Sequence, residues 1–303
     1  MSADGRFAPS PTGPLHLGGL RTALVAWLMA RAQGARFLVR IEDLDPQRSR
    51  REFEEQQLAD LRMLGINWDA PPVRQSERTA LYAEAVAQLH EMGRLYPCFC
   101  TRAEVREAAS APHSELPEGA YPGTCGRLPA AVAARRIEQG DRFAVRVRAQ
   151  AEQITFEDRL LGRFGQVVDD FVVVRADGVH AYQLAVVVDD AAQGIGEVVR
   201  GADLVASTPR QILLQRLLGL PTPGYTHVPL VLGPSGERLA KRDGGATLAD
   251  RDEPASATLA LLAHSLGLAA ERAHVNTASE LLNEFDPESI PRMEFKVDEA
   301  LQP

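Results

Sequence analysis

The chain contains 303 residues, and its 45% hydrophobic and 24% charged residues are typical of a globular protein with two or three domains. Its formal net charge of -8 argues against non-specific nucleic-acid binding by bulk charge, although it allows RNA binding by a local basic patch. No apolar run reaches the ~20 residues of a membrane span, and the N-terminus lacks the basic-then-apolar layout of a secretory signal. We therefore expect a cytoplasmic protein with no membrane partner.

Residues 6–19, R-F-A-P-S-P-T-G-P-L-H-L-G-G, predict a short strand, a turn and the start of a helix. The prolines exclude a helix in this segment, and apolar residues then recur at helical spacing over residues 20–32. Unpaired backbone N–H groups at such a helix start can bind an anion, and His16 can donate to a phosphate oxygen. A nucleotide site and a proline–glycine loop with a surface histidine both explain these residues taken alone.

A strand expected at residues 37–41 completes a strand–helix–strand unit and indicates a parallel sheet. Three acidic residues, Glu42, Asp43 and Asp45, stand at the carboxyl end of this strand, where open α/β sheets bind their ligands. The alternative is a solvated turn. Helices are expected next at residues 51–65 and 76–93.

Residues 84–179 are predicted to form an α+β insertion. Residues 101–126 are rich in proline and glycine and predict loops. The alternation of apolar and basic residues at 143–148 predicts an edge strand, and further strands are expected at residues 154–160 and 167–174.

Residues 182–188 are apolar except for Gln183, and we predict them to be a buried strand ending in Asp189-Asp190. A helix is expected at residues 209–218, followed by a loop-rich region with a short strand at residues 228–232. A last helix is expected at residues 254–268.

Four segments resemble the sequence blocks of the class I glutamyl-tRNA synthetases, in the same order along the chain. Residues 6–19 resemble the opening block, with H-L-G-G at residues 16–19 in the place of the HIGH signature. Residues 36–49 and 198–211 resemble the second and third blocks. R-L-A-K-R at residues 238–242 stands in the place of the KMSKS signature, with arginine for its first lysine and alanine for its serine.

The resemblance implies an α/β fold, with a class I Rossmann-type core and parallel sheet formed by residues 1–83 and 180–220. Residues 84–179 would form an inserted domain that binds the acceptor and zinc. Residues 221–303 would form a small, mainly helical domain that resembles the stem-contact region and carries the KMSKS-like loop.

The implied activity is ATP-dependent activation of L-glutamate, in which the α-carboxylate attacks the α-phosphate and gives glutamyl-adenylate. His16 and Lys241 are the expected catalytic residues. Both would bind ATP together with Gly18 and Gly19, and Mg²⁺ would bridge the phosphates. The alternative for the segment around Lys241 is a basic surface loop.

Five residues fall at the glutamate-contacting positions of the family, and their chemistry suits a ligand with two carboxylates and one ammonium: Arg6, Ser10, Glu42, Tyr182 and Arg200. The two arginines can each bind a carboxylate. Glu42 can pair with the ammonium, and Tyr182 supplies a neutral donor.

The three cysteines of the chain cannot form a fully paired disulfide framework, which favours a reduced compartment or a metal. Cys98, Cys100 and Cys125 offer three thiolates to a structural zinc, which takes four ligands. Tyr121 matches the zinc motif of one branch of the family, and His113 or water is the fallback for the fourth position. The alternative is three free thiols.

About 60 residues follow Lys241, too few for the helical anticodon-binding region of the family. This short form resembles a branch that esterifies queuosine in the anticodon loop of tRNA(Asp). We therefore expect ATP, L-glutamate and the anticodon arm of tRNA(Asp) as partners of a monomer. The alternatives are a truncated synthetase that charges a tRNA 3′ end and a non-catalytic tRNA-binding paralogue.

Overall fold

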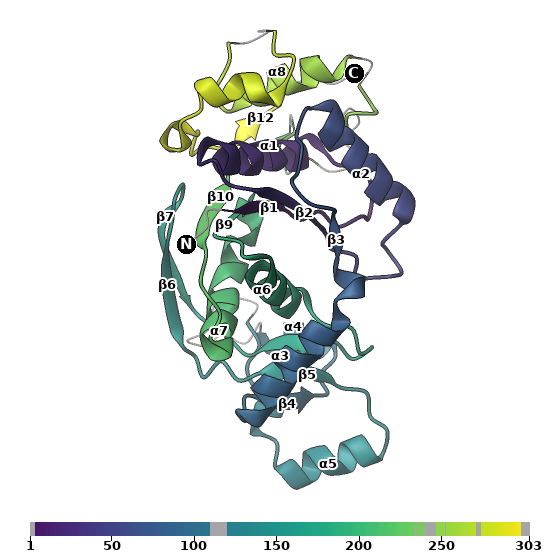
Figure 1. Ribbon diagram of the computed structural model, residues 1–303. Coiled ribbons are helices and arrows are strands. Elements are labelled where there is room, and N and C mark those ends of the chain that lie inside the picture. Colours follow the sequence, from purple (N-terminus) through teal and green to yellow (C-terminus); the bar gives the residue numbers. More distant parts are fainter. Residues whose placement is uncertain are drawn as a thin grey trace.

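The computed structural model describes residues 4–109, 120–233, 235–237, 239, 247–251, 253–270 and 274–297. Its centre is a seven-stranded sheet in the order β3-β2-β1-β9-β10-β6-β7 (Figure 1). The strands of this sheet are β1 (Gly5–Phe7), β2 (Phe37–Ile41), β3 (Val73–Arg74), β6 (Gln153–Asp158), β7 (Gly162–Val167), β9 (Glu197–Gly201) and β10 (Gly224–Val228). Neighbouring strands pair in parallel except β6 and β7, which form an antiparallel hairpin.

Helices cover both faces of this sheet (Figure 1). One apolar core contains residues of α1 (Leu17–Ala32), α2 (Arg51–Met63) and α8 (Ala255–Ser265). A second core contains residues of α3 (Thr79–Glu91), α6 (Tyr182–Gln193) and α7 (Thr208–Leu218). Because both faces are covered, every residue of β2 is buried, as its F-L-V-R-I sequence predicts.

The order of the strands places a crevice beside β1. The chain runs from β1 through α1 to β2 on one side, and returns much later as β9 on the other side of β1. The connection after β1 leads to α1 on one face of the sheet, and the connection after β9 leads to α7 on the other face. The carboxyl ends of β1 and β9 therefore form a topological switch point, where α/β sheets bind their ligands. The predicted parallel sheet is confirmed, and so is the predicted helix after residues 6–19.

The prediction of a strand at residues 182–188 is wrong, because these residues begin helix α6. The helix starts after an extended Ala181 and ends at Gly194, whose φ of 70° is left-handed. The apolar run is buried between the sheet and two further helices, so it carries no polar face that would reveal a helical period. In the helix, Asp189 and Asp190 directly follow the apolar run and are buried.

The predicted edge strand at residues 143–148 is instead a central strand. β5 (Ala144–Val147) lies between β4 (Leu95–Cys98) and β8 (Phe171–Val174) in a three-stranded antiparallel sheet. The predicted strand at residues 167–174 is divided, because β7 ends at Val167 and β8 begins at Phe171 in the other sheet. The insertion also contains α4 (Arg102–Ala109), the short helix η2 (Cys125–Arg127) and α5 (Ala130–Glu138).

The main sheet extends across two of the domain limits expected from the sequence. Hairpin β6–β7 belongs by number to the insertion, yet β6 pairs with β10 through Asp158 and Tyr225. Strand β10 lies beyond residue 220, yet it pairs with β9 along its whole length. Backbone pairing between segments this far apart in the chain has no local signature in the sequence.

The C-terminal part packs on the outer side of α1 (Figure 1). Besides α8, its elements are β11 (Val231–Leu232), η4 (Ala278–Asn283), η5 (Pro287–Ser289) and β12 (Phe295–Lys296). The remaining short helices are η1 (Gln75–Glu77) and η3 (Ala202–Ser207). Within the described residues, every helix is too short or too polar to cross a membrane.

Candidate active site

A cavity of about 400 Å³ opens at the carboxyl ends of β1, β2, β9 and β10, beside the N-terminus of α1. Its walls bring together eight residues that the sequence predicts for ATP and glutamate: Arg6, Ser10, His16, Gly18, Gly19, Glu42, Tyr182 and Arg200. Lys241, the remaining residue of the predicted ATP site, lies outside the described residues.

The N-terminus of α1 is shaped by His16, which is its N-cap residue. The Nδ1 atom of His16 accepts the backbone N–H of Gly19 at 3.1 Å, so the proton of the neutral ring is on Nε2. A Cβ atom at Gly18 would lie 3.0 Å from the His16 ring and would force the ring to move. The Gly19 N–H therefore donates to the N-cap residue itself. The His16 ring then carries its hydrogen-bond donor on Nε2.

Arg6 lies in the wall of the cavity, but its guanidinium is already paired. Its Nε and Nη2 donate to the two carboxylate oxygens of Asp190 at 3.0 and 3.4 Å, and its Nη1 donates to the carbonyl of Val199 at 3.2 Å. Both charged side chains are buried. A substrate carboxylate would therefore share Arg6 with Asp190.

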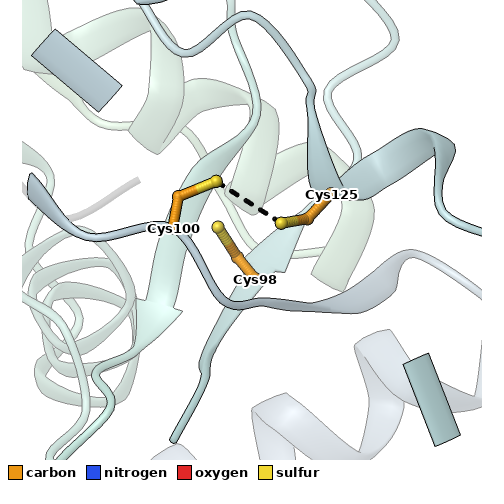
Figure 2. Close-up of side chains that lie close together, drawn as sticks. All are labelled: Cys98, Cys100 and Cys125. Atoms are coloured by element: carbon orange, nitrogen blue, oxygen red, sulfur yellow. Dashed lines mark hydrogen bonds between the residues drawn. The ribbon is translucent and has the colours of Figure 1, made fainter. Parts of the chain in front are cut away.

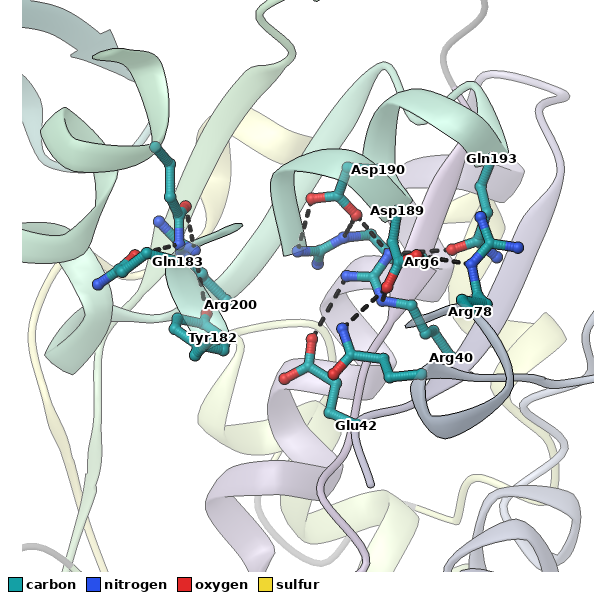
Figure 3. A network of polar contacts seen from close by, with 12 residues as sticks. Arg6, Arg40, Glu42, Arg78, Tyr182, Gln183, Asp189, Asp190, Gln193 and Arg200 are labelled. Carbon is teal, nitrogen blue, oxygen red and sulfur yellow. Dashed lines mark hydrogen bonds and ion pairs between the residues drawn. The ribbon is translucent and has the colours of Figure 1, made fainter. Parts of the chain in front are cut away.

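Arg40 is fully buried and contacts both Asp190 on α6 and Glu42 after β2 (Figure 3). Its position inside an apolar strand does not reveal this role. Its Nη1 donates to Asp190 at 2.6 Å and to Gln193 at 2.9 Å, and its Nη2 donates to Glu42 at 3.4 Å. Asp190 thus compensates two buried arginines at once. Burial by itself raises the pKa of Asp190, but Arg40 and Arg6 lower it below its ordinary value.

Asp189, the neighbour of Asp190 on α6, forms hydrogen bonds with residues 75–82, which include the first turn of α3. It accepts from Arg78 at 2.6 Å, from the hydroxyl of Tyr82 at 2.8 Å and from the amide of Gln75 at 2.9 Å. The acidic pair at the end of the apolar run is visible in the sequence, but the partners lie more than 100 residues away in the chain.

Glu42 is the carboxylate of the cavity wall that suits an ammonium group. Its side chain is only 11% exposed, and its contact with Arg40 is long, at 3.4 Å. Burial raises the pKa of Glu42, and the nearby Arg40 and Arg6 offset this effect only in part. A ligand ammonium would supply the additional positive charge that this buried carboxylate needs.

Arg200 differs from Arg6 and Arg40 because its hydrogen-bond partners are neutral (Figure 3). Its Nη1 donates to Gln211 at 2.8 Å and to Tyr182 at 3.3 Å. In the part of the chain that the structure describes, no carboxylate lies within ion-pair distance of Arg200. A buried cation of this kind favours a bound anion.

The three cysteines lie close together (Figure 2), with Cys98 at the end of β4 and Cys125 at the start of the short helix η2. Their sulfur atoms all lie within 4.8 Å of one another, and those of Cys100 and Cys125 are 3.4 Å apart. The Tyr121 hydroxyl lies 3.4 Å from the sulfur of Cys98 and 3.7 Å from that of Cys100. Zinc with Zn–S bonds of ~2.3 Å in a tetrahedron separates its sulfur ligands by about 3.8 Å. The three thiols could therefore hold a zinc ion, with the Tyr121 hydroxyl beside them.

Arginine side chains stack on the aromatic rings around the cysteine group. The guanidinium of Arg146 lies 3.8 Å from the ring centre of Tyr121, and that of Arg148 lies 4.5 Å from the ring centre of Tyr96. These contacts fix both arginines on β5 and its flank, on a part of the insertion that is locally basic. Residues 120–149 contain six arginines and two acidic residues.

Comparison with known proteins assigns the sequence to a family. Residues 3–302 match the family described as "tRNA synthetases class I (E and Q), catalytic domain". A protein of Nocardia farcinica named "Glutamyl-Q tRNA(Asp) synthetase" is 54% identical over 295 residues, which are 96% of this chain and 92% of that protein. A protein of the same name from Symbiobacterium thermophilum is 48% identical over 307 residues, 97% of this chain and 95% of its own.

The fold agrees with this assignment. The crystal structure of a glutamate tRNA ligase from Elizabethkingia meningosepticum, in complex with its amino acid, superposes with a TM-score of 0.84 at 27% identity. The superposition covers 99% of this chain and 68% of that ligase. The chain therefore belongs to the class I tRNA synthetases of the E and Q group, whose catalytic domain it contains.

Proposed function

We propose that the protein is a ligase that activates L-glutamate with ATP in the absence of tRNA, and transfers the glutamyl group to queuosine in the anticodon loop of tRNA(Asp). The observation that carries the proposal is the cavity that gathers the eight described residues expected to bind glutamate and ATP. The names of relatives that are 54% and 48% identical over nearly the whole chain support queuosine as the acceptor.

The wall of the cavity offers one group for each charge of glutamate. Arg200, whose protein partners are neutral, binds one carboxylate, and Glu42 binds the ammonium. Tyr182 and Ser10 add neutral hydroxyl groups. Arg6 shares its charge between Asp190 and the second carboxylate.

The activation step forms a bond between the α-carboxylate oxygen and the α-phosphorus of ATP, and breaks the bond from that phosphorus to the bridging oxygen of pyrophosphate. Negative charge grows on the phosphate oxygens in the transition state. The Nε2–H of His16 is the donor that the α1 N-terminus directs to this reaction, and Lys241 adds a positive charge. Mg²⁺ bound with ATP neutralises charge on the phosphates.

The insertion holds a structural zinc through Cys98, Cys100 and Cys125, with Tyr121 as the fourth ligand. The mutual distances of the three sulfur atoms and the phenol oxygen support this assignment. The core around these residues contains few apolar side chains, so a metal would supply much of its stability.

The basic part of the insertion contacts the anticodon arm. Arg127, Arg135 and Arg142 are exposed there on a chain that is acidic as a whole. Unpaired bases of an anticodon loop can be splayed out and stacked on aromatic rings or guanidinium planes. The vicinal hydroxyls of queuosine resemble those of the terminal ribose that synthetases esterify, so one site geometry suits both acceptors.

The test uses labelled glutamate, ATP and two preparations of tRNA(Asp), from cells with and without queuosine, each with an intact 3′ end. We expect adenylate formation without tRNA, measured as glutamate-dependent exchange of pyrophosphate into ATP. We expect label only in the tRNA that contains queuosine. Equal labelling of both preparations would assign the protein to 3′-end charging, and absence of exchange would make it a non-catalytic RNA-binding protein.

A further inference from the structure

A buried histidine on β10 that does not line the cavity contacts Arg200. His227 is 0% exposed and stands directly beside Arg200 in the parallel register of β9 and β10. Its Nε2 atom lies 3.1 Å from the Nε of Arg200 and 3.2 Å from the hydroxyl of Thr208, which itself accepts from Arg200 at 2.7 Å. The Nε and Nη2 edge of the guanidinium is therefore held by two side chains from different elements.

The protonation of His227 follows from its other ring nitrogen. Nδ1 lies 2.6 Å from a carboxylate oxygen of Asp158, at the end of β6. The same carboxylate accepts the backbone N–H groups of His227, Leu160 and Leu161, so it is fixed and acts only as an acceptor. Nδ1 must therefore carry the proton, and Nε2 presents a lone pair to the Nε–H of Arg200.

The surroundings keep this ring neutral. Burial lowers the pKa of His227 and the adjacent Arg200 lowers it further, while the hydrogen bond to Asp158 raises it, and the result lies below the ordinary value. A second proton on the ring would turn Nε2 into a donor that faces the donor of Arg200. The Tyr225 ring stacks on the imidazole at 6.1 Å between centroids and restricts its rotation.

We propose that Asp158 and His227 are positioning residues, which hold Arg200 with its unpaired charge directed at a carboxylate of the amino-acid substrate. The proposal rests on the proposed activation of glutamate. An arginine has five N–H donors, and four hydrogen bonds to neutral groups in the described part of the chain leave one N–H and the whole charge for the ligand. The neutral acceptor at Nε2 orients Arg200 without competing for its charge. A carboxylate in that place would compete with the ligand for it.

Two substitutions separate orientation of Arg200 from packing. His227→Asn keeps a polar group near Asp158 but cannot reach Arg200, whereas His227→Gln can present its amide oxygen at the position of Nε2. We expect His227→Asn to raise the KM for glutamate about tenfold or more, with a smaller change in kcat and an unchanged KM for ATP. We expect His227→Gln to recover most of the glutamate KM. His264→Asn on α8, outside the cavity, is the matched control and should leave all three constants unchanged.

The readout is glutamate-dependent pyrophosphate exchange with each variant and the wild type. An active wild type with the same glutamate KM in His227→Asn would overturn the positioning role, whereas an inactive wild type would overturn the proposed function instead. Nitrogen NMR of histidine-labelled wild-type protein tests the tautomer without any substitution. We expect a neutral ring at position 227 protonated on Nδ1, and a ring protonated on Nε2 would refute the proposal even if the variants failed to fold.

Discussion

Replacement of Asp190 by asparagine should destabilise the protein strongly, whereas the same change of charge at Glu42 should not. Both carboxylates contact Arg40, and both are buried. Asp190 is shared by two arginines and its pKa lies below the ordinary value, but burial raises the pKa of Glu42 above it. The ionised carboxylate of Asp190 therefore stabilises the folded state, and that of Glu42 destabilises it.

The size of the effect follows from the contacts that asparagine cannot replace. Asp190→Asn removes the negative charge opposite Arg40 at 2.6 Å and opposite Arg6 at 3.0 Å. In the described residues Arg6 has no other carboxylate partner. Breaking a buried ion pair from one side typically costs about 3–5 kcal/mol, and because Asp189 and Glu42 still face Arg40 we expect about 3 kcal/mol. This is a factor of ~100 in the folding equilibrium.

Thermal and denaturant unfolding of the wild type, Asp190→Asn and Glu42→Gln at neutral pH measure these differences. We expect the first variant to melt roughly 5–10 °C lower and the second to melt at or above the wild-type temperature. The contribution of Asp190 should be complete above the pKa of the unfolded carboxyl group and disappear as the pH falls through its lower folded-state pKa. Equal destabilisation by the two variants would refute the assignment of opposite roles.

Four further predictions concern the active site and the insertion. Glu42→Gln should raise the KM for glutamate by about tenfold or more in pyrophosphate exchange, because the ammonium loses its charged partner, and an unchanged KM would remove Glu42 from the pocket. Gly18→Ala should lower the exchange rate at an unchanged melting temperature, since its Cβ would displace the His16 ring; full activity would contradict this steric reading. Lys241→Ala should lower kcat ~100-fold with little effect on glutamate binding, measured by calorimetry, and unchanged exchange would exclude it from the mechanism. The purified protein should contain about one zinc, and Cys125→Ser should lose it and lower the melting temperature; elemental analysis that finds no zinc in the wild type would refute the metal site.

Local chemistry was sufficient to predict the start of the fold. Prolines in residues 6–14 and the paired glycines before an apolar helix led to the strand, the turn and helix α1. The strand at residues 37–41 with its acidic end also followed from the sequence, because a buried parallel strand is apolar throughout. The predicted grouping of Cys98, Cys100 and Cys125 is confirmed, and it followed from the resemblance of their spacing to a zinc motif of the family.

Elements buried on every side were harder to predict. The pattern of residues 182–188 indicates a strand although they form α6, because a short helix enclosed by apolar neighbours shows no amphipathic period. The alternation of arginines with apolar residues at 143–148 indicates an edge strand, yet Arg146 on β5 and Arg148 directly after it stack on Tyr121 and Tyr96 beside a three-stranded sheet. The side-chain pattern was the same in both alternatives, and only the neighbouring chain segments distinguish them.

Motifs of a few adjacent residues are sufficient to predict the family and eight of the residues that line the cavity, because the chemistry of each motif is local. The distribution of charge in the cavity follows from the tertiary structure instead. Asp190 lies 184 residues from Arg6, and Asp158 lies 69 residues from His227. Whether a buried arginine is compensated by a carboxylate or left to a ligand depends on contacts between such distant segments, which form only when the sheet and its helices pack together.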